Sequence, residues 1–195
     1  MRTFRRICVY CGSKPGDDSL FIDAARKVGR ALAEHGIGLV FGGGRVGLMG
    51  ALADAALAAG GDVFGVIPHK LQEQEIAHGR LTELFVVDSM HARKMVMAQL
   101  ADGFIALPGG FGTLDELFEI TTWNQLGYHH KPVGLLNVGG YFDLLLRFLD
   151  HAAQRGFVRP DHRAILHAAP ELSELLGAMA HAAIPAPGRP EGPPP

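Results

Sequence analysis

The stretch Gly38-Leu-Val-Phe-Gly-Gly-Gly-Arg-Val-Gly-Leu-Met-Gly50 joins a short apolar run to a glycine-rich loop, and an alanine-rich helical segment follows it. A short run without polar residues is typical of a strand that is buried on both faces of a parallel sheet. Similar runs recur along most of the chain. We expect strands at Arg6–Cys11, Gly38–Phe41, Val63–Ile67, Leu84–Val87, Phe104–Leu107 and Val133–Leu136.

Helical segments separate most of these runs. We expect helices at Leu20–His35, Leu48–Ala59, Met90–Ala101, Thr113–Leu126 and Tyr141–Arg155. The alternation predicts an α/β fold, namely a Rossmann-like, doubly wound parallel sheet with helices on both faces. Such sheets bind ligands at the carboxyl ends of their strands, so functional residues are expected just after the strands.

The length of 195 residues and the apolar content of 48% fit one globular domain, which we place at residues 1–184. Residues 185–195 hold six of the twelve prolines and are expected to form a disordered tail. A net charge of −2 gives no electrostatic basis for binding nucleic acid. No apolar run approaches the ~20 residues of a membrane span, and the N-terminus lacks the features of a secretory signal. We therefore expect a cytoplasmic protein without a nucleic-acid or membrane partner.

The chain has two cysteines, Cys8 and Cys11, in a CxxC spacing. A redox pair of this type sits at a helix N-terminus, where the thiol pKa is lowered. Here both cysteines lie in an apolar, strand-like run, and two strand residues three positions apart point to opposite faces. A zinc site would need further ligands, and the sequence has no second cluster. We therefore interpret both as buried strand residues.

Three glycine-bearing loops follow strands and point to a phosphate ligand. Glycine lets backbone N–H groups approach a ligand closely, and a helix N-terminus favours an anion. One such loop is weak support, because a tight turn from strand to helix needs glycine anyway, but three in one sheet favour a phosphate site. The residues concerned are Gly12 and Ser13, Gly43 and Gly44 within 42–50, and Gly109, Gly110, Phe111 and Gly112 within 108–116.

The phosphate compound is not expected to be a dinucleotide. Gly42-x-Gly44-x-x-Gly47 matches the dinucleotide fingerprint in form, but that fingerprint requires an acidic residue at the end of the next strand. Asp62 has the spacing and precedes that strand, whereas Pro68 and His69 follow it. No Walker A sequence is present.

The segment Met90-His-Ala-Arg-Lys94 places two adjacent cations at the start of a helix after a strand. Cations at this end oppose the helix dipole, so an anionic partner would account for Arg93 and Lys94. The alternative is a solvated helix start. His91 fits an acid–base role or a structural role equally well.

Glu116 is the strongest candidate for a catalytic residue. Thr113-x-x-Glu116 is a capping-box pattern, and helix capping alone would account for both residues. The same spacing also puts a carboxylate within one turn of the glycine loop, with Glu119 one turn later. A carboxylate there could stabilise the oxocarbenium-like state of glycosidic cleavage and activate water. These residues alone leave both readings open.

The motif Pro108-Gly-Gly-Phe-Gly-Thr-Leu-Asp-Glu116 resembles the PGGxGTxxE motif of the LONELY GUY family, the cytokinin riboside 5′-monophosphate phosphoribohydrolases. The resemblance covers roughly residues 5 to 160. It includes Ile7–Ser13, Gly42–Gly50, Met90–Lys94, Thr122–Gly127 and Lys131–Asn137.

This resemblance implies hydrolysis of the N-glycosidic bond of a nucleoside 5′-monophosphate, such as isopentenyladenosine monophosphate or AMP, to free base and ribose 5-phosphate. It implies a homodimer with the site near the subunit interface. No carboxylate or His/Cys cluster of the sequence has the spacing of metal ligands, so we expect neither a metal nor a cofactor. Arg93 and Glu116 would be the catalytic pair. The nucleotide site would be lined by Met90, Lys94, Gly109 to Thr113, Leu114, Asp115 and Thr122, together with the first two glycine loops.

The sequence departs from the family at one position. Plant relatives carry a glutamate about fourteen residues before MHxRK, whereas Gly79 stands here, with Glu75 and Glu83 nearby. The broad apolar coverage of the expected helix 113–126 also suits burial against both the sheet and a second subunit. The alternative is a helix buried within its own subunit.

Three other functions compete with the phosphoribohydrolase, and each requires different chemistry from the residues of the site. The lysine decarboxylase label once given to the family requires a lysine in a pyridoxal site, and none of the five lysines sits in one. A non-catalytic nucleotide-binding module, or a carrier of a phosphorylated pterin cofactor, could use the same fold. The pairing of Glu116 with Arg93 favours an enzyme, because a binder of anions gains nothing from a carboxylate beside its ligand.

Overall fold

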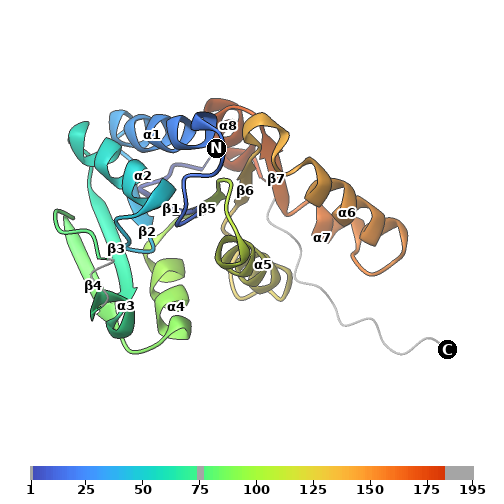
Figure 1. The fold of residues 1–195 in the computed structure, drawn as a ribbon. Coiled ribbons are helices and arrows are strands. Elements are labelled where there is room, and N and C mark those ends of the chain that lie inside the picture. Colours follow the sequence, from blue (N-terminus) through green and yellow to red (C-terminus); the bar gives the residue numbers. More distant parts are fainter. Residues whose placement is uncertain (1, 74–76, 183–195) are drawn as a thin grey trace.

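The structure is a computed structural model that describes residues 2–73 and 77–182, and seven parallel strands form its central sheet (Figure 1). The strands run in the order β4-β3-β2-β1-β5-β6-β7. Their bounds are β1 Arg6–Tyr10, β2 Gly38–Phe41, β3 Val63–Pro68, β4 Glu83–Val87, β5 Gly103–Ala106, β6 Val133–Leu136 and β7 Leu166–Ala169.

The strand order reverses beside β1. The chain adds β2, β3 and β4 on one side of β1 and then returns to add β5, β6 and β7 on the other. Strand β1 pairs with β2 through Cys8 and Val40, and with β5 through Tyr10 and Ala106. The connections after β1 and β5 lead to helices on opposite faces of the sheet, and in doubly wound sheets a crevice forms at the carboxyl edge at such a reversal.

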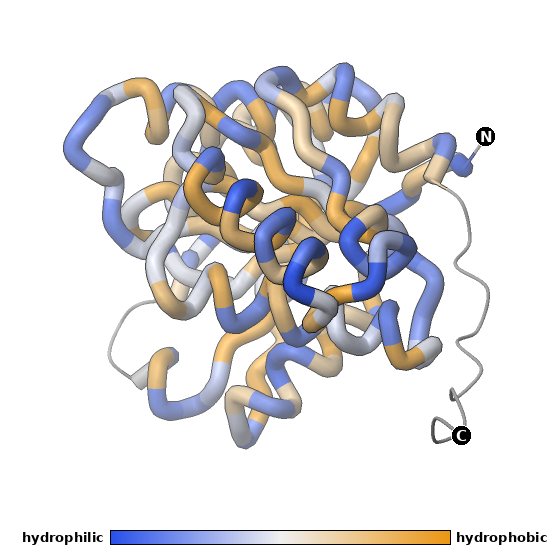
Figure 2. Tube along the Cα trace, turned by 90° about the vertical axis from the view of Figure 1, so that its right-hand side faces the viewer, coloured by the Kyte–Doolittle hydropathy of each residue, from blue (hydrophilic) through white to orange (hydrophobic). Residues whose placement is uncertain are grey.

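Helices cover both faces of the sheet, as the alternating pattern predicted (Figure 1). Helices α1, α2 and α8 pack with one hydrophobic cluster, and α4, α5 and α6 pack with the other. Figure 2 shows hydrophobic segments concentrated towards the middle of the fold. The helix bounds are α1 Ser19–Glu34, α2 Gly47–Ala58, α3 His69–Glu73, α4 Met90–Leu100, α5 Phe111–Gln125, α6 Asp143–Gln154, α7 Pro160–Arg163 and α8 Leu172–Ala180.

Strand β1 illustrates why the sheet is buried on both faces. Ile7 and Val9 pack in one hydrophobic cluster, whereas Cys8 and Tyr10 pack in the other. Cys11, just beyond the strand, belongs to the cluster opposite that of Cys8. Both cysteines are free and buried, and burial raises the pKa of each thiol well above its ordinary value. Their predicted positions on opposite faces are confirmed.

The predicted fold class is confirmed, and the six predicted strands agree with the observed ones to within one residue at each end. The prediction missed β7 and the short or late helices α3, α7 and α8. The start of α5 was also predicted wrongly, as described below. The proline-rich tail at 185–195 and Glu75 lie outside the described residues, so the boundary at residue 184 stays a prediction. Among the residues that the structure describes, no helix combines the length and apolar character that crossing a membrane would require.

Candidate active site

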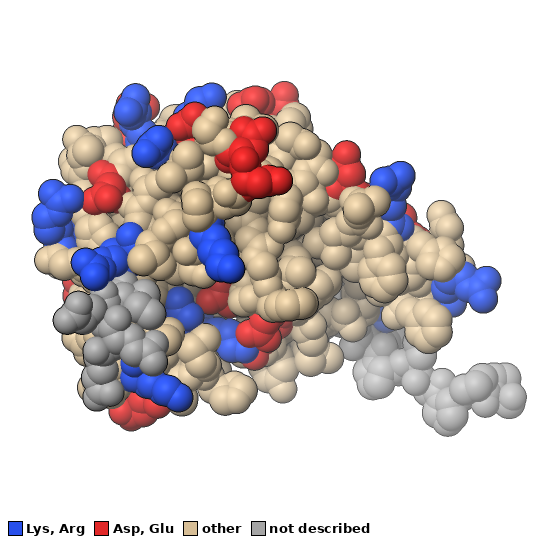
Figure 3. Space-filling model, in the orientation of Figure 1, with Lys and Arg blue, Asp and Glu red and all other residues tan. Residues whose placement is uncertain are grey.

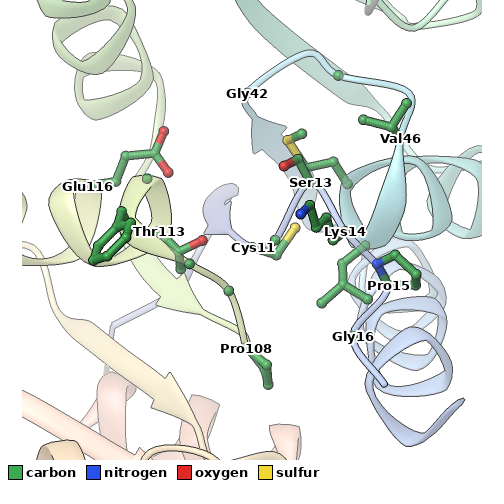
Figure 4. A pocket seen from close by; sticks show the side chains of 18 of the residues that line it. Cys11, Ser13, Lys14, Pro15, Gly16, Gly42, Val46, Pro108, Thr113 and Glu116 are labelled. Atoms are coloured by element: carbon green, nitrogen blue, oxygen red, sulfur yellow. The ribbon is translucent and has the colours of Figure 1, made fainter. Parts of the chain in front are cut away.

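A cavity of about 770 Å³ opens at the carboxyl edge of the sheet, beside the reversal of strand order. All three predicted glycine loops contribute to its wall. In Figure 4, Glu116 and Thr113 lie on one side, and Ser13, Lys14 and Pro15 lie on the other. The lining residues are Cys11–Asp17, Phe21, Gly42, Gly44, Val46, Leu48, Met49, Ile67, Leu71, Met90, Arg93, Pro108–Thr113, Glu116 and Tyr141.

The three loops are bonded directly to one another. The N–H of Gly12 donates to the carbonyl oxygen of Pro108 at 3.0 Å, and the N–H of Leu48 donates to that of Gly12 at 3.0 Å. Gly47 has a φ of 59°, and a Cβ there would lie 2.3 Å from the carbonyl carbon of Ser13. A side chain at Gly47 would therefore push the first loop away from the second. The three glycine loops therefore form one connected backbone unit.

Arg93 is held beside these three loops by hydrogen bonds to the backbone. It projects from α4, is 8% exposed, and donates from Nε to the carbonyl oxygen of Val66 at 3.1 Å and from Nη2 to that of Gly42 at 2.9 Å. A Cβ at Gly42 would lie 1.8 Å from Nη2, so only glycine leaves room for the guanidinium. Nη1 lies 3.7 Å from Glu116 Oε1. Arg93 is thus fixed to the backbone of β3 and to the residue after β2, and its remaining amino group lies between Glu116 and the sulfur of Met90, which is 3.8 Å away.

Glu116 is a buried carboxylate that faces the cavity. It lies on α5 and is 9% exposed. Burial raises its pKa to about 7, and the positive charge of Arg93 opposes this rise only in part. A group with a pKa near the working pH can both accept and donate a proton, which suits acid–base catalysis.

The predicted capping box is wrong. Helix α5 begins at Phe111, with Gly110 as its N-cap, and no side-chain hydrogen bond caps it. Thr113 and Glu116 therefore lie inside the helix, because Phe111 and Gly112 already adopt helical backbone geometry. Thr113 is instead a buried residue of the cavity wall. The helix start has no capping hydrogen bond from a side chain and lies on the cavity, an arrangement that favours an anion.

Lys94 is oriented away from the cavity. Its Nζ lies 2.9 Å from Glu119 Oε2 and 3.2 Å from Asp115 Oδ2. Burial acts to lower the pKa of Lys94, but the hydrogen bonds to Glu119 and Asp115 prevail and raise it. The single positive charge of the lysine is thus shared by two carboxylates that lie near Glu116 on α5. Glu119, the alternative catalytic carboxylate, is engaged in this ion pair and does not line the cavity.

The remaining predicted residues divide into two groups. The cavity brings together Gly12, Ser13, Gly44, Met90, Gly109, Gly110, Phe111, Gly112 and Thr113 with Arg93 and Glu116. Residues that do not line it are Gly43, Lys94, Leu114, Asp115 and Thr122. The hydroxyl of Thr122 donates to its own helix, at the carbonyl oxygen of Phe118. His91 is exposed and does not line the cavity either.

Sequence reasoning missed several wall residues. Lys14 directly follows the first loop, and its position there was a usable signal. Tyr141 lies after β6, in a segment with no motif. Gly79 is exposed and does not line the cavity, and Glu83 begins β4 at the strand end away from it.

In residues 2–73 and 77–182, the structure contains no group of three or more His, Cys, Asp or Glu side chains placed to hold a metal ion.

Comparison with known proteins identifies sequence relatives over most of the chain. A family model described as "Possible lysine decarboxylase" matches residues 49–179. The "Probable cytokinin riboside 5'-monophosphate phosphoribohydrolase LOGL5" of Oryza sativa subsp. japonica is 54% identical over 173 residues, which cover 89% of this chain and 70% of the relative. The "Cytokinin riboside 5'-monophosphate phosphoribohydrolase LOG2" of Arabidopsis thaliana is 50% identical, with coverage of 89% and 81%.

Solved structures share the fold at lower identity. The molybdenum cofactor binding protein of Rippkaea orientalis superposes with a TM-score of 0.68 at 26% identity, covering 91% of this chain and 98% of that one. The molybdenum cofactor carrier protein of Chlamydomonas reinhardtii, with a TM-score of 0.66, 22% identity and coverage of 90% and 96%, is similar in fold alone. The identity to the phosphoribohydrolases is about twice as high and extends over 89% of this chain. The chain belongs to the LONELY GUY family of cytokinin riboside 5′-monophosphate phosphoribohydrolases.

Proposed function

We propose that this protein hydrolyses the N-glycosidic bond of nucleoside 5′-monophosphates, such as AMP and isopentenyladenosine monophosphate, and releases the free base and ribose 5-phosphate. The observation that carries the proposal is the buried Arg93–Glu116 pair, 3.7 Å apart, in the wall of a cavity built from three glycine loops. The relatives named phosphoribohydrolases support the same reaction.

The phosphate would bind where the glycine loops and the N-terminus of α5 meet. Backbone N–H groups and the helix dipole favour an anion there, and Gly110 leaves the helix start without a side-chain competitor. Binding of the phosphate would then position the ribose next to Glu116. A remote group can accelerate a reaction in this way, because its binding energy is used to orient the reacting bond.

Glu116 would act in its carboxylate form. As the bond from C1′ to the base nitrogen breaks, positive charge develops on the ribose, and a nearby carboxylate stabilises it. Water adds to C1′, and Glu116 accepts its proton. The same proton can pass to the departing base, so one water is consumed and the net charge is conserved. A pKa of about 7 makes both transfers feasible near neutral pH.

Arg93 would orient and tune Glu116 rather than grip the phosphate. Its Nε and Nη2 already donate to main-chain oxygens, which leaves Nη1 as the amino group nearest the carboxylate. Without this positive charge the pKa of Glu116 would rise further, since Arg93 is the largest influence that lowers it.

We also propose a homodimer formed by the layer of α4, α5 and α6. Exposed large apolar side chains gather on this layer, whereas Leu117 and Ile120 of α5 are buried in their own core. The surface in front of α5 and towards α6 is largely uncharged in Figure 3. Met90 and Phe111 are both exposed and line the cavity, so a subunit on this layer would meet the cavity mouth. The exposed residues are Met90, Met95, Phe111, Phe118, Leu126, Tyr128, Leu144 and Phe148.

The test incubates the purified protein with AMP or isopentenyladenosine monophosphate, without added metal or cofactor, and measures free base by chromatography. Glu116→Gln should bind AMP yet lose about 10²-fold or more in kcat, and Arg93→Ala should also lose turnover. Glu119→Gln is the matched control, because it removes a carboxylate of the same helix outside the cavity and should keep most of the activity. Binding without cleavage by the wild type would instead identify a nucleotide-binding or carrier module.

A further inference from the structure

Tyr141 lies outside every motif that predicted the site, yet it contacts the central glycine loop. Its hydroxyl donates to the carbonyl oxygen of Gly109 at 2.6 Å, across 32 positions in the chain. The residue also lines the cavity. It follows β6, so the segment after this strand reaches the same wall as the three glycine loops, which follow β1, β2 and β5.

The backbone around Tyr141 is held in a tight turn. The short 3-10 helix Val138–Gly140 precedes it, with Gly139 and Gly140 at φ values of 57° and 73°. The side chain of Asn137 accepts from the N–H of Phe142 at 2.7 Å and donates to Asp143 at 2.7 Å. These bonds bridge the turn on both sides of Tyr141 and fix where its Cα lies.

The ring of Tyr141 is half-exposed and contacts two neighbouring aromatic rings. It packs edge-on against Phe21 with a centroid distance of 5.7 Å, and against Phe142 at 5.0 Å. Edge-to-face contacts at such distances are favourable, and they restrict the rotamer. The hydroxyl is therefore placed by the turn and by two neighbouring rings, not by the hydrogen bond alone.

Holding the carbonyl of Gly109 also holds the N–H of Gly110. Both groups belong to one planar peptide unit, so the direction of one determines the direction of the other. Glycine on both sides allows this unit to rotate more freely than other residues would.

We propose that Tyr141 is a positioning residue that fixes the Gly109–Gly110 peptide in the orientation that binds the phosphate group of the substrate. The inference rests on the proposed function, because it assigns to the phosphate the glycine loop at the start of α5. Tyr141 takes no part in bond cleavage; it acts on the affinity for the phosphate-bearing part of the ligand.

Tyr141→Phe tests this step, because it removes the hydroxyl and keeps both ring contacts. We expect the KM for AMP to rise about 5-fold, the usual worth of one such hydrogen bond, with little change in kcat or Tm. The Kd of ribose 5-phosphate, measured by isothermal titration calorimetry, should rise by the same factor. The kcat/KM for adenosine, which lacks the phosphate, should not change. Tyr128→Phe is the matched control, since Tyr128 is 78% exposed and does not line the cavity.

Unchanged KM for AMP and unchanged Kd for ribose 5-phosphate in Tyr141→Phe would overturn the inference. An equal loss for AMP and adenosine together with a lower Tm would also overturn it, because that result describes a purely structural tyrosine. If the wild type releases no base from AMP, the proposed function fails. The titration with ribose 5-phosphate then still decides the role of Tyr141.

Discussion

Replacing Glu116 by glutamine should stabilise the protein at high pH while it abolishes turnover. Burial raises the pKa of Glu116 from its ordinary 4.5 to about 7. Between these two values the folded protein binds more protons at this site than the unfolded chain does, so stability falls as pH rises through the window. Below about pH 4.5 the carboxyl is neutral in both states and the cost disappears. Above about pH 7 the full cost of a buried charge is present.

The size of this effect follows from the pKa difference. A shift of about 2.5 units corresponds to about 3 kcal/mol. Integrated between pH 5 and pH 8, the gain in stability of Glu116→Gln over the wild type should grow by about 2 to 3 kcal/mol. For a chain of this length the Tm of the variant should move upward, relative to the wild type, by roughly 5 to 10 °C between these two pH values.

The assay is urea unfolding of wild type and Glu116→Gln at pH 5 and pH 8, at one protein concentration because the proposed dimer links stability to concentration. Comparing the two pH values cancels any pH-independent effect of the amide on packing. Glu119→Gln, whose carboxylate is paired with Lys94, should not show the same pH-dependent gain. A stability difference between wild type and Glu116→Gln that is equal at both pH values would refute the reasoning, and Glu116 would then titrate as an ordinary carboxylate.

Three further predictions concern the surroundings of Glu116. Gly42→Ala places a Cβ where Nη2 of Arg93 now lies, so kcat should fall about 10²-fold or more; Gly177→Ala, whose Cβ would meet open space, is the control for added bulk. Lys94→Met removes a charge that lowers the pKa of Glu116, and it frees two carboxylates that raise this pKa. The rise of kcat/KM with pH should therefore move to higher pH. An unchanged pH–rate profile would exclude an influence of Lys94 on the pKa of Glu116. Phe118→Glu puts a charge on the exposed layer of α4 to α6 and should convert a dimer to a monomer in light scattering; a monomeric wild type at micromolar concentration would contradict the proposed interface.

Residue-level predictions failed where a pattern had two explanations. The spacing of Thr113 and Glu116 fits a capping box, but it does not state where the helix begins. The start at Phe111 depends on the backbone of a glycine loop that is bonded to the loop after β1. Lys94 is adjacent in sequence to Arg93, yet the two side chains leave α4 in different directions. One reaches the cavity and the other reaches Asp115 and Glu119.

The sequence by itself predicted six of the seven strands and the glycine loops after three of them, because the apolar character of short runs and the turn preferences of glycine are local properties. It also determined the family, through a motif of nine consecutive residues. The strand order, by contrast, decided that three distant loops share one cavity. Tertiary packing also set the pKa of Glu116, the anchoring of Arg93 and the position of Tyr141, since each depends on contacts between residues far apart in the chain. Desolvation and hydrogen-bond partners come from the surroundings of a side chain in space, and a linear spacing does not contain them.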